Sequence, residues 1–98
     1  MTNGAEATLG GRVRRQEGVI TQEAKGQTIL LRLEDGGYYA IDEVGAMIWS
    51  LCDGDHVVAE IVAQLCAEFD APKAIVQADV LEFIADLQRE RLLVVDSA

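Results

Sequence analysis

The side chains best suited to chemistry are two cysteines and one histidine. Cys52 and Cys66 lie fourteen positions apart in segments that we expect to be helical, and this spacing fits neither a C-x-x-C redox motif nor a zinc-binding pattern. His56 has no second metal ligand close to it in the sequence. We therefore expect the cysteines to act as small buried apolar residues and His56 to lie in a solvated loop. No metal site and no cofactor is predicted.

The same inventory speaks against catalysis. The sequence contains no glycine-rich phosphate loop, no nucleophile elbow and no Ser, His and Asp residues spaced as a catalytic set. With a single histidine, the sequence offers few side chains for acid–base or nucleophilic catalysis. We expect no catalytic residues and conclude that the protein is not an enzyme.

The charge is unevenly distributed along the 98 residues. Residues 1–39 carry five basic and five acidic side chains, whereas residues 40–98 carry three basic and twelve acidic ones, so the net charge of −9 belongs to the second segment. Binding to phosphate backbones requires Lys and Arg, so nucleic acid is a disfavoured partner. Solubility alone is an alternative reason for the acidity.

Hydropathy excludes a membrane partner and sets the expected location. No run of about 18 apolar residues is present, so no membrane-spanning helix is predicted. The N-terminus lacks the apolar region of a signal peptide. We expect a cytoplasmic protein with one folded domain.

The predicted secondary structure changes from strand to helix near residue 42, and these elements must position any site. Tyr38–Ile41 is predicted to be a strand, and Asp42 is predicted to cap a helix. That helix carries one apolar stripe at i, i+3, i+4 and i+7, formed by Val44, Met47, Ile48 and Leu51. Trp49 is expected to be a core anchor, and Asp53-Gly54-Asp55 is expected to end the helix.

Short strands are predicted before this point. Residues 1–15 are expected to be a flexible tail, with a point near Val13 where it could settle into the fold, and residues 16–98 the folded domain. Glu17–Glu23 is a short strand candidate, and Gln27–Glu34 is a clearer one because Ile29, Leu31 and Leu33 alternate with other residues and give one apolar face. Asp35-Gly36-Gly37 suits a tight hairpin turn into Tyr38–Ile41. These strands form an expected three-stranded antiparallel sheet.

Two further helices are predicted after residue 55. The second helix extends from about Val57 to Phe69, and the third begins near Pro72 and ends near Arg89. The run Leu92–Val95 is expected to be extended. The order of a sheet followed by three helices indicates a small α+β domain of the winged helix-turn-helix type. A winged-helix DNA-binding protein is one alternative function, although Asp79, Glu82 and Asp86 on the third helix would repel phosphate.

Four separated blocks resemble the PqqD-like family. Gly45-Ala46-Met47-Ile48-Trp49-Ser50-Leu51-Cys52-Asp53-Gly54 is similar to the family segment G-x-x-I-W-x-L-x-D-G, and three further blocks follow in the same order: Glu60-Ile61-Val62, Asp79 to Leu87, and Leu92-Leu93-Val94. The resemblance covers about residues 17–95. This chain departs from the family at Val57, where Thr or Ser is frequent and Asp55 is an alternative cap, and at Arg91, where Gly is frequent.

The resemblance implies a function. Members of the family are recognition elements that bind the leader segment of ribosomally synthesised, modified peptides. A separate chain of this length resembles either the pyrroloquinoline quinone type or the leader-binding subunit of a split lasso-peptide protease, and the lasso type is favoured. The implied partners are a precursor leader peptide and a companion leader peptidase or cyclising enzyme. A general protein-interaction subunit is another alternative, and a homodimer formed through strand edges stays open.

A mechanism follows from an exposed strand edge. An extended peptide can add to such an edge, with main-chain hydrogen bonds for affinity and alternating side-chain pockets for specificity. In the family this strand lies beside the third helix. The predicted leader-binding residues are Tyr38, Tyr39, Ala40, Ile41, Val76, Asp79, Val80, Phe83, Ile84 and Leu87. Of these, Val80, Ile84 and Leu87 are expected to be mostly core, whereas Val76, Asp79 and Phe83 are expected to make the closer contacts. Tyr38 and Tyr39 should point to opposite faces of the sheet.

Overall fold

The structure is a computed structural model that describes residues 8–96. Three helices and six strands follow one another in the order β1 (Arg12–Arg15), β2 (Val19–Ala24), β3 (Gln27–Arg32), β4 (Tyr38–Ile41), α1 (Glu43–Ser50), β5 (Asp53–Val57), α2 (Val58–Glu68), α3 (Lys73–Arg89) and β6 (Leu93–Asp96). The expected α+β class is confirmed, and the winged-helix likeness stays a prediction.

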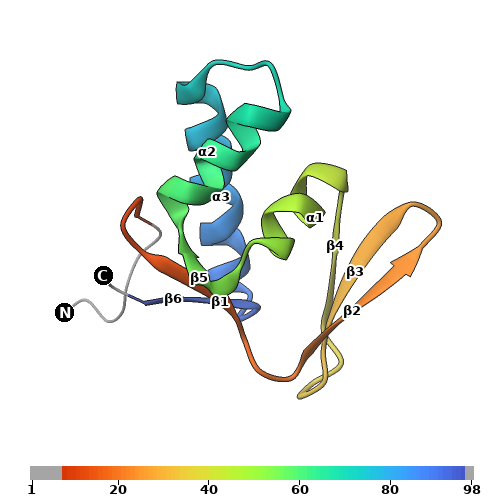
Figure 1. Ribbon diagram of the computed structural model, residues 1–98. Coiled ribbons are helices and arrows are strands. Elements are labelled where there is room, and N and C mark those ends of the chain that lie inside the picture. Colours follow the sequence, from red (N-terminus) through yellow and green to blue (C-terminus); the bar gives the residue numbers. More distant parts are fainter. Residues whose placement is uncertain (1–7, 97–98) are drawn as a thin grey trace.

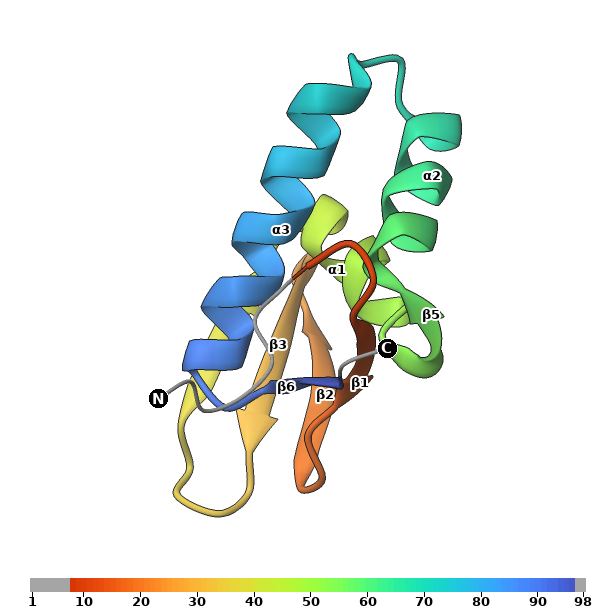
Figure 2. The same ribbon diagram turned by 90° about the vertical axis from the view of Figure 1, so that its left-hand side faces the viewer.

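The strands form two separate antiparallel sheets. Sheet A has the order β5-β1-β6, and sheet B has the order β2-β3-β4. Sheet A lies below the α2–α3 pair in Figure 1, and α1 separates that helix pair from sheet B. Figure 2 shows α2 and α3 as an antiparallel pair that meets at the 69–72 connection.

Sheet B confirms the predicted three-stranded sheet, whereas sheet A was not predicted. Residues 8–15 were expected to belong to a flexible tail, but Arg12–Arg15 is the central strand of sheet A and Val13 is fully buried. The tail prediction is therefore wrong for this strand, because its partners lie some 40 and 80 residues further along the chain and give no local signal. Residues 1–7 of the predicted tail lie outside the described residues.

The helix ends follow the capping chemistry of the sequence. The Asp42 carboxylate accepts the Gly45 N–H at 2.8 Å, which confirms Asp42 as the cap of α1. The segment after α1 is a strand rather than a simple helix stop, although Gly54 has the expected positive φ of 88°. Val57 is the N-cap of α2, and the Glu60 carboxylate accepts its N–H at 2.9 Å, so Asp55 is not the cap.

One core joins the three helices to both sheets. It contains Trp49 from α1, Ile61 from α2 and Ile84 from α3, together with Leu30 from sheet B and Val95 from sheet A. Burying each such aliphatic side chain stabilises the fold by about 1.5–3 kcal/mol. The expected core role of Trp49 is confirmed, and the terminal run is the extended strand β6.

A polar cluster around Trp49 connects the two sheets. The Arg15 guanidinium donates to the Trp49 carbonyl at 3.0 Å and lies 5.3 Å from the centre of the Trp49 ring. The Trp49 indole N–H donates to the Thr21 hydroxyl at 3.1 Å. Arg15 belongs to sheet A and Thr21 to sheet B, so this cluster fixes how the sheets meet.

None of the helices between residues 8 and 96 combines the length and apolar character that a membrane crossing requires.

Candidate peptide-binding site

Strand β4 is an edge of sheet B, because β3 is its only strand partner among residues 8–96. The hydrogen bonds at the ends of β3 show which backbone groups are free. Leu33 N–H donates to the Gly18 carbonyl, and Arg32 N–H donates to the Gly37 carbonyl, each at 2.8 Å. Hydrogen-bonded pairs alternate along an antiparallel ladder. Odd-numbered residues of β3 therefore bond to β2, and even-numbered ones bond to β4.

This alternation assigns the free edge. The partners of the even-numbered β3 residues are Tyr39 and Ile41, whose backbone groups are used within the sheet. The N–H and C=O groups of Tyr38 and Ala40 consequently point away from β3 and form the free edge. Among the described residues, no other strand pairs with this edge.

The side chains of β4 point alternately to the two faces of sheet B. Ile41 is buried and Tyr39 is half-buried on the face that packs against the core, whereas Tyr38 and Ala40 are exposed on the opposite face. The prediction that the two tyrosines face opposite ways is confirmed. Tyr39 and Ile41 are thus the β4 side chains on the core side.

Helix α3 presents most of its predicted contact residues to the core. Val80, Ile84 and Leu87 are fully buried, as expected. Val76 is also buried, Phe83 is half-buried, and Asp79 is exposed. Phe83 packs against the backbone of α1, since a Cβ added to Gly45 would lie only 2.9 Å from Phe83 Cε1. The open part of α3 is therefore the surface near its N-terminal half.

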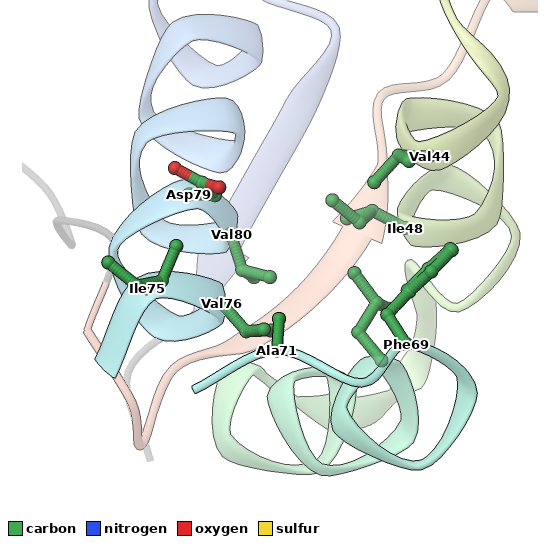
Figure 3. Close-up of a pocket in the computed structure, with 9 residues that line it drawn as sticks. Val44, Ile48, Phe69, Ala71, Ile75, Val76, Asp79 and Val80 are labelled. Atoms are coloured by element: carbon green, nitrogen blue, oxygen red, sulfur yellow. The ribbon is translucent and has the colours of Figure 1, made fainter. Parts of the chain in front are cut away.

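An apolar pocket of about 180 Å³ lies at that end of α3. Its lining residues come from α1, α2, the connection after α2, and α3: Val44, Ile48, Leu65, Phe69, Ala71, Ile75, Val76, Asp79 and Val80. Figure 3 shows Val44 and Ile48 of α1 facing Val76 and Val80 of α3 across the pocket. Three predicted residues, Val76, Asp79 and Val80, line it. None of the four predicted β4 residues does so, but Val44 follows the end of β4 by three positions. The pocket thus begins close to where the free edge ends.

Residues 27–93 match the family described as coenzyme PQQ synthesis protein D (PqqD). The chain belongs to the PqqD family. The resemblance inferred from its sequence motifs is confirmed by this match.

Relatives and solved structures agree with that membership. A PqqA binding protein of Xanthomonas oryzae pv. oryzae (strain PXO99A) is 40% identical over 70 residues, or 71% of this chain and 74% of the relative. The structure of TbiB1 in complex with the TbiA(beta) leader peptide is 31% identical, with a TM-score of 0.74, over 82% of this chain and 93% of TbiB1. The solution NMR structure of the PqqD truncation of Methylobacterium extorquens PqqCD, which represents a stand-alone RiPP recognition element, is 29% identical, with a TM-score of 0.69, over 83% and 86% of the two chains.

The far end of α3 in this PqqD family member is tied to the β3–β4 turn. Arg32 donates to the Glu90 carbonyl and to the Asp35 carboxylate, and Arg91 approaches Asp35 at 3.4 Å. The hydrogen bond from Arg32, helped by that from the Gly37 N–H, lowers the pKa of Asp35 to about 2. These contacts hold the end of α3 close to the Tyr38 end of β4. The Phe83–Gly45 contact holds the middle of α3 close to α1.

Sequence reasoning missed most of the pocket. Val44, Phe69 and Ile75 line it with large side chains that stay partly exposed, and Ile75 is 56% exposed. Val44 belongs to the apolar stripe predicted for the first helix, and Phe69 lies at the predicted end of the second helix, but neither residue is among the predicted contacts. Ile75 lies beside the main α3 stripe in sequence, and an apolar residue beside a stripe in the first turn of a helix is the signal that could have revealed it.

The two cysteines and the histidine make contacts that belong to the fold. Cys52 is buried, its thiol donates to the Ile48 carbonyl at 3.2 Å, and burial raises the thiol pKa to about 12. Cys66 is a partly buried free thiol. His56 lies in strand β5 rather than in the expected loop, and its Nδ1 is 2.9 Å from the Asp53 carboxylate. Within residues 8–96, no group of three His, Cys, Asp or Glu side chains could hold a metal ion.

Proposed function

We propose that this protein is a non-catalytic adaptor that binds the leader segment of a ribosomally synthesised precursor and presents the precursor to its processing enzymes. The observation that carries this proposal is a free β4 edge that ends beside an apolar pocket. Membership of the PqqD family and the likeness to TbiB1, which is solved with a leader peptide, support it.

The leader adds to β4 as a fourth strand of sheet B. The outward N–H and C=O groups of Tyr38 and Ala40 form the main-chain ladder with it. Alternate side chains of the added strand point to the core side and meet α3, where Phe83 remains partly accessible. The ladder gives affinity for any extended segment, and the contacts with α3 distinguish one leader from another.

The pocket anchors an apolar side chain of the leader. A chain that follows β4 past Ile41 meets Val44 and then the pocket wall formed by Ile75 and Val76. Each apolar anchor contributes about 1.5–3 kcal/mol. Ordering a disordered leader costs about 2–5 kcal/mol, so two or three anchors together with the ladder suit micromolar or tighter binding. Asp79, which forms no ion pair with another described residue, attracts a basic leader side chain to the rim.

The partners follow from the adaptor role. They are the precursor and a companion leader peptidase or cyclising enzyme in the cytoplasm. The acidic second segment makes nucleic acid an unfavourable partner. A lasso-type leader and a pyrroloquinoline quinone-type leader are the two candidate ligands, and a parallel titration with both, together with labelled DNA at low salt, distinguishes them. We expect saturable binding to one leader, with the lasso type favoured, and none to DNA.

Proline substitutions in β4 test the strand addition. Ala40→Pro removes an outward N–H, and edge strands tolerate Pro at such positions. We expect the dissociation constant of the cognate leader, measured by fluorescence polarisation, to rise at least tenfold while the protein stays folded. Tyr39→Pro is the matched control because it removes an N–H used by β3, so it should lower stability. Unchanged leader affinity in a folded Ala40→Pro protein would refute strand addition.

A charged residue in the pocket tests the anchor. Ile75→Asp places a carboxylate at an exposed pocket position, so folding should survive. We expect leader affinity to fall at least tenfold because an apolar side chain would meet a charge. Ala67→Asp, at an exposed position of α2 that does not line the pocket, should leave affinity unchanged. Equal affinities for all three proteins would contradict a role of the pocket.

A further inference from the structure

A second group of exposed apolar side chains lies on sheet B, away from the pocket. Ile20 is 41% exposed, Leu33 is 60% exposed and Tyr38 is 75% exposed. The strand register places Ile20 and Tyr38 directly opposite Leu31, on either side of it. Directly opposed residues of antiparallel strands share a face. Leu33 lies two positions from Leu31 and continues the same face.

We define the outer face of sheet B by the apolar residues that this register brings together: Ile20, Ile29, Leu31, Leu33, Tyr38 and Ala40. The polar Gln22 lies opposite Ile29 at the β2 side of the same face. The opposite face holds Thr28, Leu30 and Ile41, which are all buried. The apolar alternation of Ile29, Leu31 and Leu33, which is the clearest strand signal in the sequence, therefore lies on the face that the chain leaves partly exposed. Figure 1 shows the β2–β3 hairpin of this sheet projecting away from α2 and α3.

We propose that the outer face of sheet B is the docking surface for the enzyme that processes or modifies the precursor, through an apolar patch of that enzyme rimmed by Lys and Arg. The proposal rests on the proposed leader-binding function. A surface that served only solubility would carry polar residues on this face, as the half-solvated face of an antiparallel sheet ordinarily does.

Continuity with the leader edge favours the processing enzyme as the occupant. Tyr38 and Ala40 supply the free backbone edge of β4, and their side chains belong to the outer face. An enzyme seated there lies next to the leader strand without competing for α3 or for the pocket, which are on the other side of β4. The precursor segment that leaves the edge is then delivered close to the enzyme.

Charge favours an enzyme over a second copy of this chain. The protein has a net charge of −9, and exposed Glu34 follows Leu33 at the end of the face. Residues 1–39, which include most of this face, balance five basic against five acidic side chains, so the repulsion between two copies comes from the net charge of the whole molecules. A basic rim on another protein would instead be attracted by that net charge. Two strands of six residues and one of four give a face of roughly 250 Å². This area is below the roughly 800 Å² per partner of a stable interface, so the contact is transient, as handing over a precursor requires.

A double substitution on the outer face separates docking from leader binding. Ile20→Lys with Leu33→Lys places two cations on the face at exposed positions outside β4. Ala63→Lys with Ala67→Lys adds the same charge at exposed positions of α2 and serves as the control. Turnover of the precursor by the enzyme encoded in the same biosynthetic locus is measured by mass spectrometry at a subsaturating concentration of this protein. The leader dissociation constant is measured in parallel.

We expect turnover to fall at least tenfold for the outer-face variant, with leader affinity unchanged within twofold and no effect of the control. Equal turnover for the two variants would overturn the docking surface while leaving leader binding intact. Loss of leader affinity in the outer-face variant alone would assign the face to the leader and also overturn the proposal. Failure of the unmodified protein to bind any leader would instead refute the proposed function.

Crosslinking and sedimentation keep the test independent of folding. A photo-crosslinking amino acid at position 33, where the native Leu33 is exposed, should capture the enzyme, and the same probe at position 67 should not. Analytical ultracentrifugation should show a monomer. The opposite result would be a dimeric unmodified protein together with an Ile20→Lys, Leu33→Lys variant that is monomeric and keeps normal turnover. This result would show that the face joins two copies, and it would overturn the proposal.

Discussion

The edges of the two sheets are built differently. In sheet A, edge strand β5 changes register against β1 and contains Gly54 at a φ of 88°. The Asp53 carboxylate accepts the Asp55 N–H at 2.9 Å, so one backbone donor of this strand is occupied by its own chain. In sheet B, β4 is regular along its whole length and leaves the groups of Tyr38 and Ala40 unpaired. Bulges and local hydrogen bonds are common ways to block pairing at an edge.

Sheet A therefore mainly supports the fold, whereas sheet B presents an exposed edge and an exposed face for binding. Sheet A buries Val13, Leu93 and Val95 beneath the helices and joins distant parts of the chain. Sheet B contributes Leu30 and Ile41 to the core but exposes one edge and much of its outer face. Substitutions in sheet A should therefore change stability, and those on the open side of sheet B should change binding.

Matched leucine truncations should show the largest contrast. Leu93 in sheet A is buried, and Leu93→Ala should lower the free energy of unfolding by about 2–5 kcal/mol through lost burial and a cavity. Leu33, at the exposed end of the outer face, should change it by less than about 0.5 kcal/mol in Leu33→Ala. Urea unfolding followed by circular dichroism measures both. Similar losses would show that the sheets do not differ in this way.

Sheet B and the three helices could be predicted because their signals are local. Residues 29–33 alternate, Gly36 has the positive φ of a turn, and Asp42 caps the helix that follows. Sheet A could not be predicted, because its strands have four or five residues and pair Arg12 with both Val57 and Asp96. Such distant pairs leave no periodic pattern in any one segment.

The candidate site was predictable only in part for a related reason. A stripe of apolar residues at helical spacing identifies a face of α3, but it does not show where other elements stop covering that face. The pocket opens because α1 is short and the chain turns away after Phe69, and both facts depend on tertiary packing. The identity of the exposed face of β3 likewise depends on which side α1 packs against.

The hydrogen bond from Trp49 of α1 to Thr21 of sheet B should make a smaller contribution. Thr21→Val keeps the shape of the side chain but removes the acceptor of the Trp49 indole N–H. Leaving that donor unpaired in a nearly buried residue should cost about 1–2 kcal/mol. Thr21→Ser retains the hydroxyl and should cost less. The fluorescence of the only tryptophan reports unfolding directly. Equal stabilities of the Val and Ser variants would contradict a role of this hydrogen bond.

Arg91, between α3 and sheet A, offers a small gain. Its φ is 61°, a left-handed conformation that costs a residue with a side chain about 1–2 kcal/mol. Gly avoids this cost, and exposed ion pairs such as those of Arg91 with Glu34 and Asp35 contribute about 0–1 kcal/mol. Arg91→Gly should therefore raise the free energy of unfolding by about 0.5 kcal/mol. The Gly variant should also be more stable than Arg91→Ala, which keeps the strained backbone. An Ala variant as stable as the Gly variant would rule out backbone strain.

The Asp53–His56 pair at the edge of sheet A should produce the smallest effect, visible as a pH dependence. The hydrogen bond from His56 lowers the pKa of Asp53 to about 2, and the same bond raises the pKa of His56 above its ordinary 6.5. The histidine contribution is complete below pH 6.5 and is lost as the pH rises through the raised pKa, whereas the aspartate contribution is lost as the pH falls from 3.8 toward 2. The stability difference between the unmodified protein and His56→Gln, measured by urea unfolding, should therefore be larger at pH 5 than at pH 8.5. A difference that stays constant between these values would show that the pair does not support the β5 edge. It would also remove one of the contrasts between that edge and the open edge of β4.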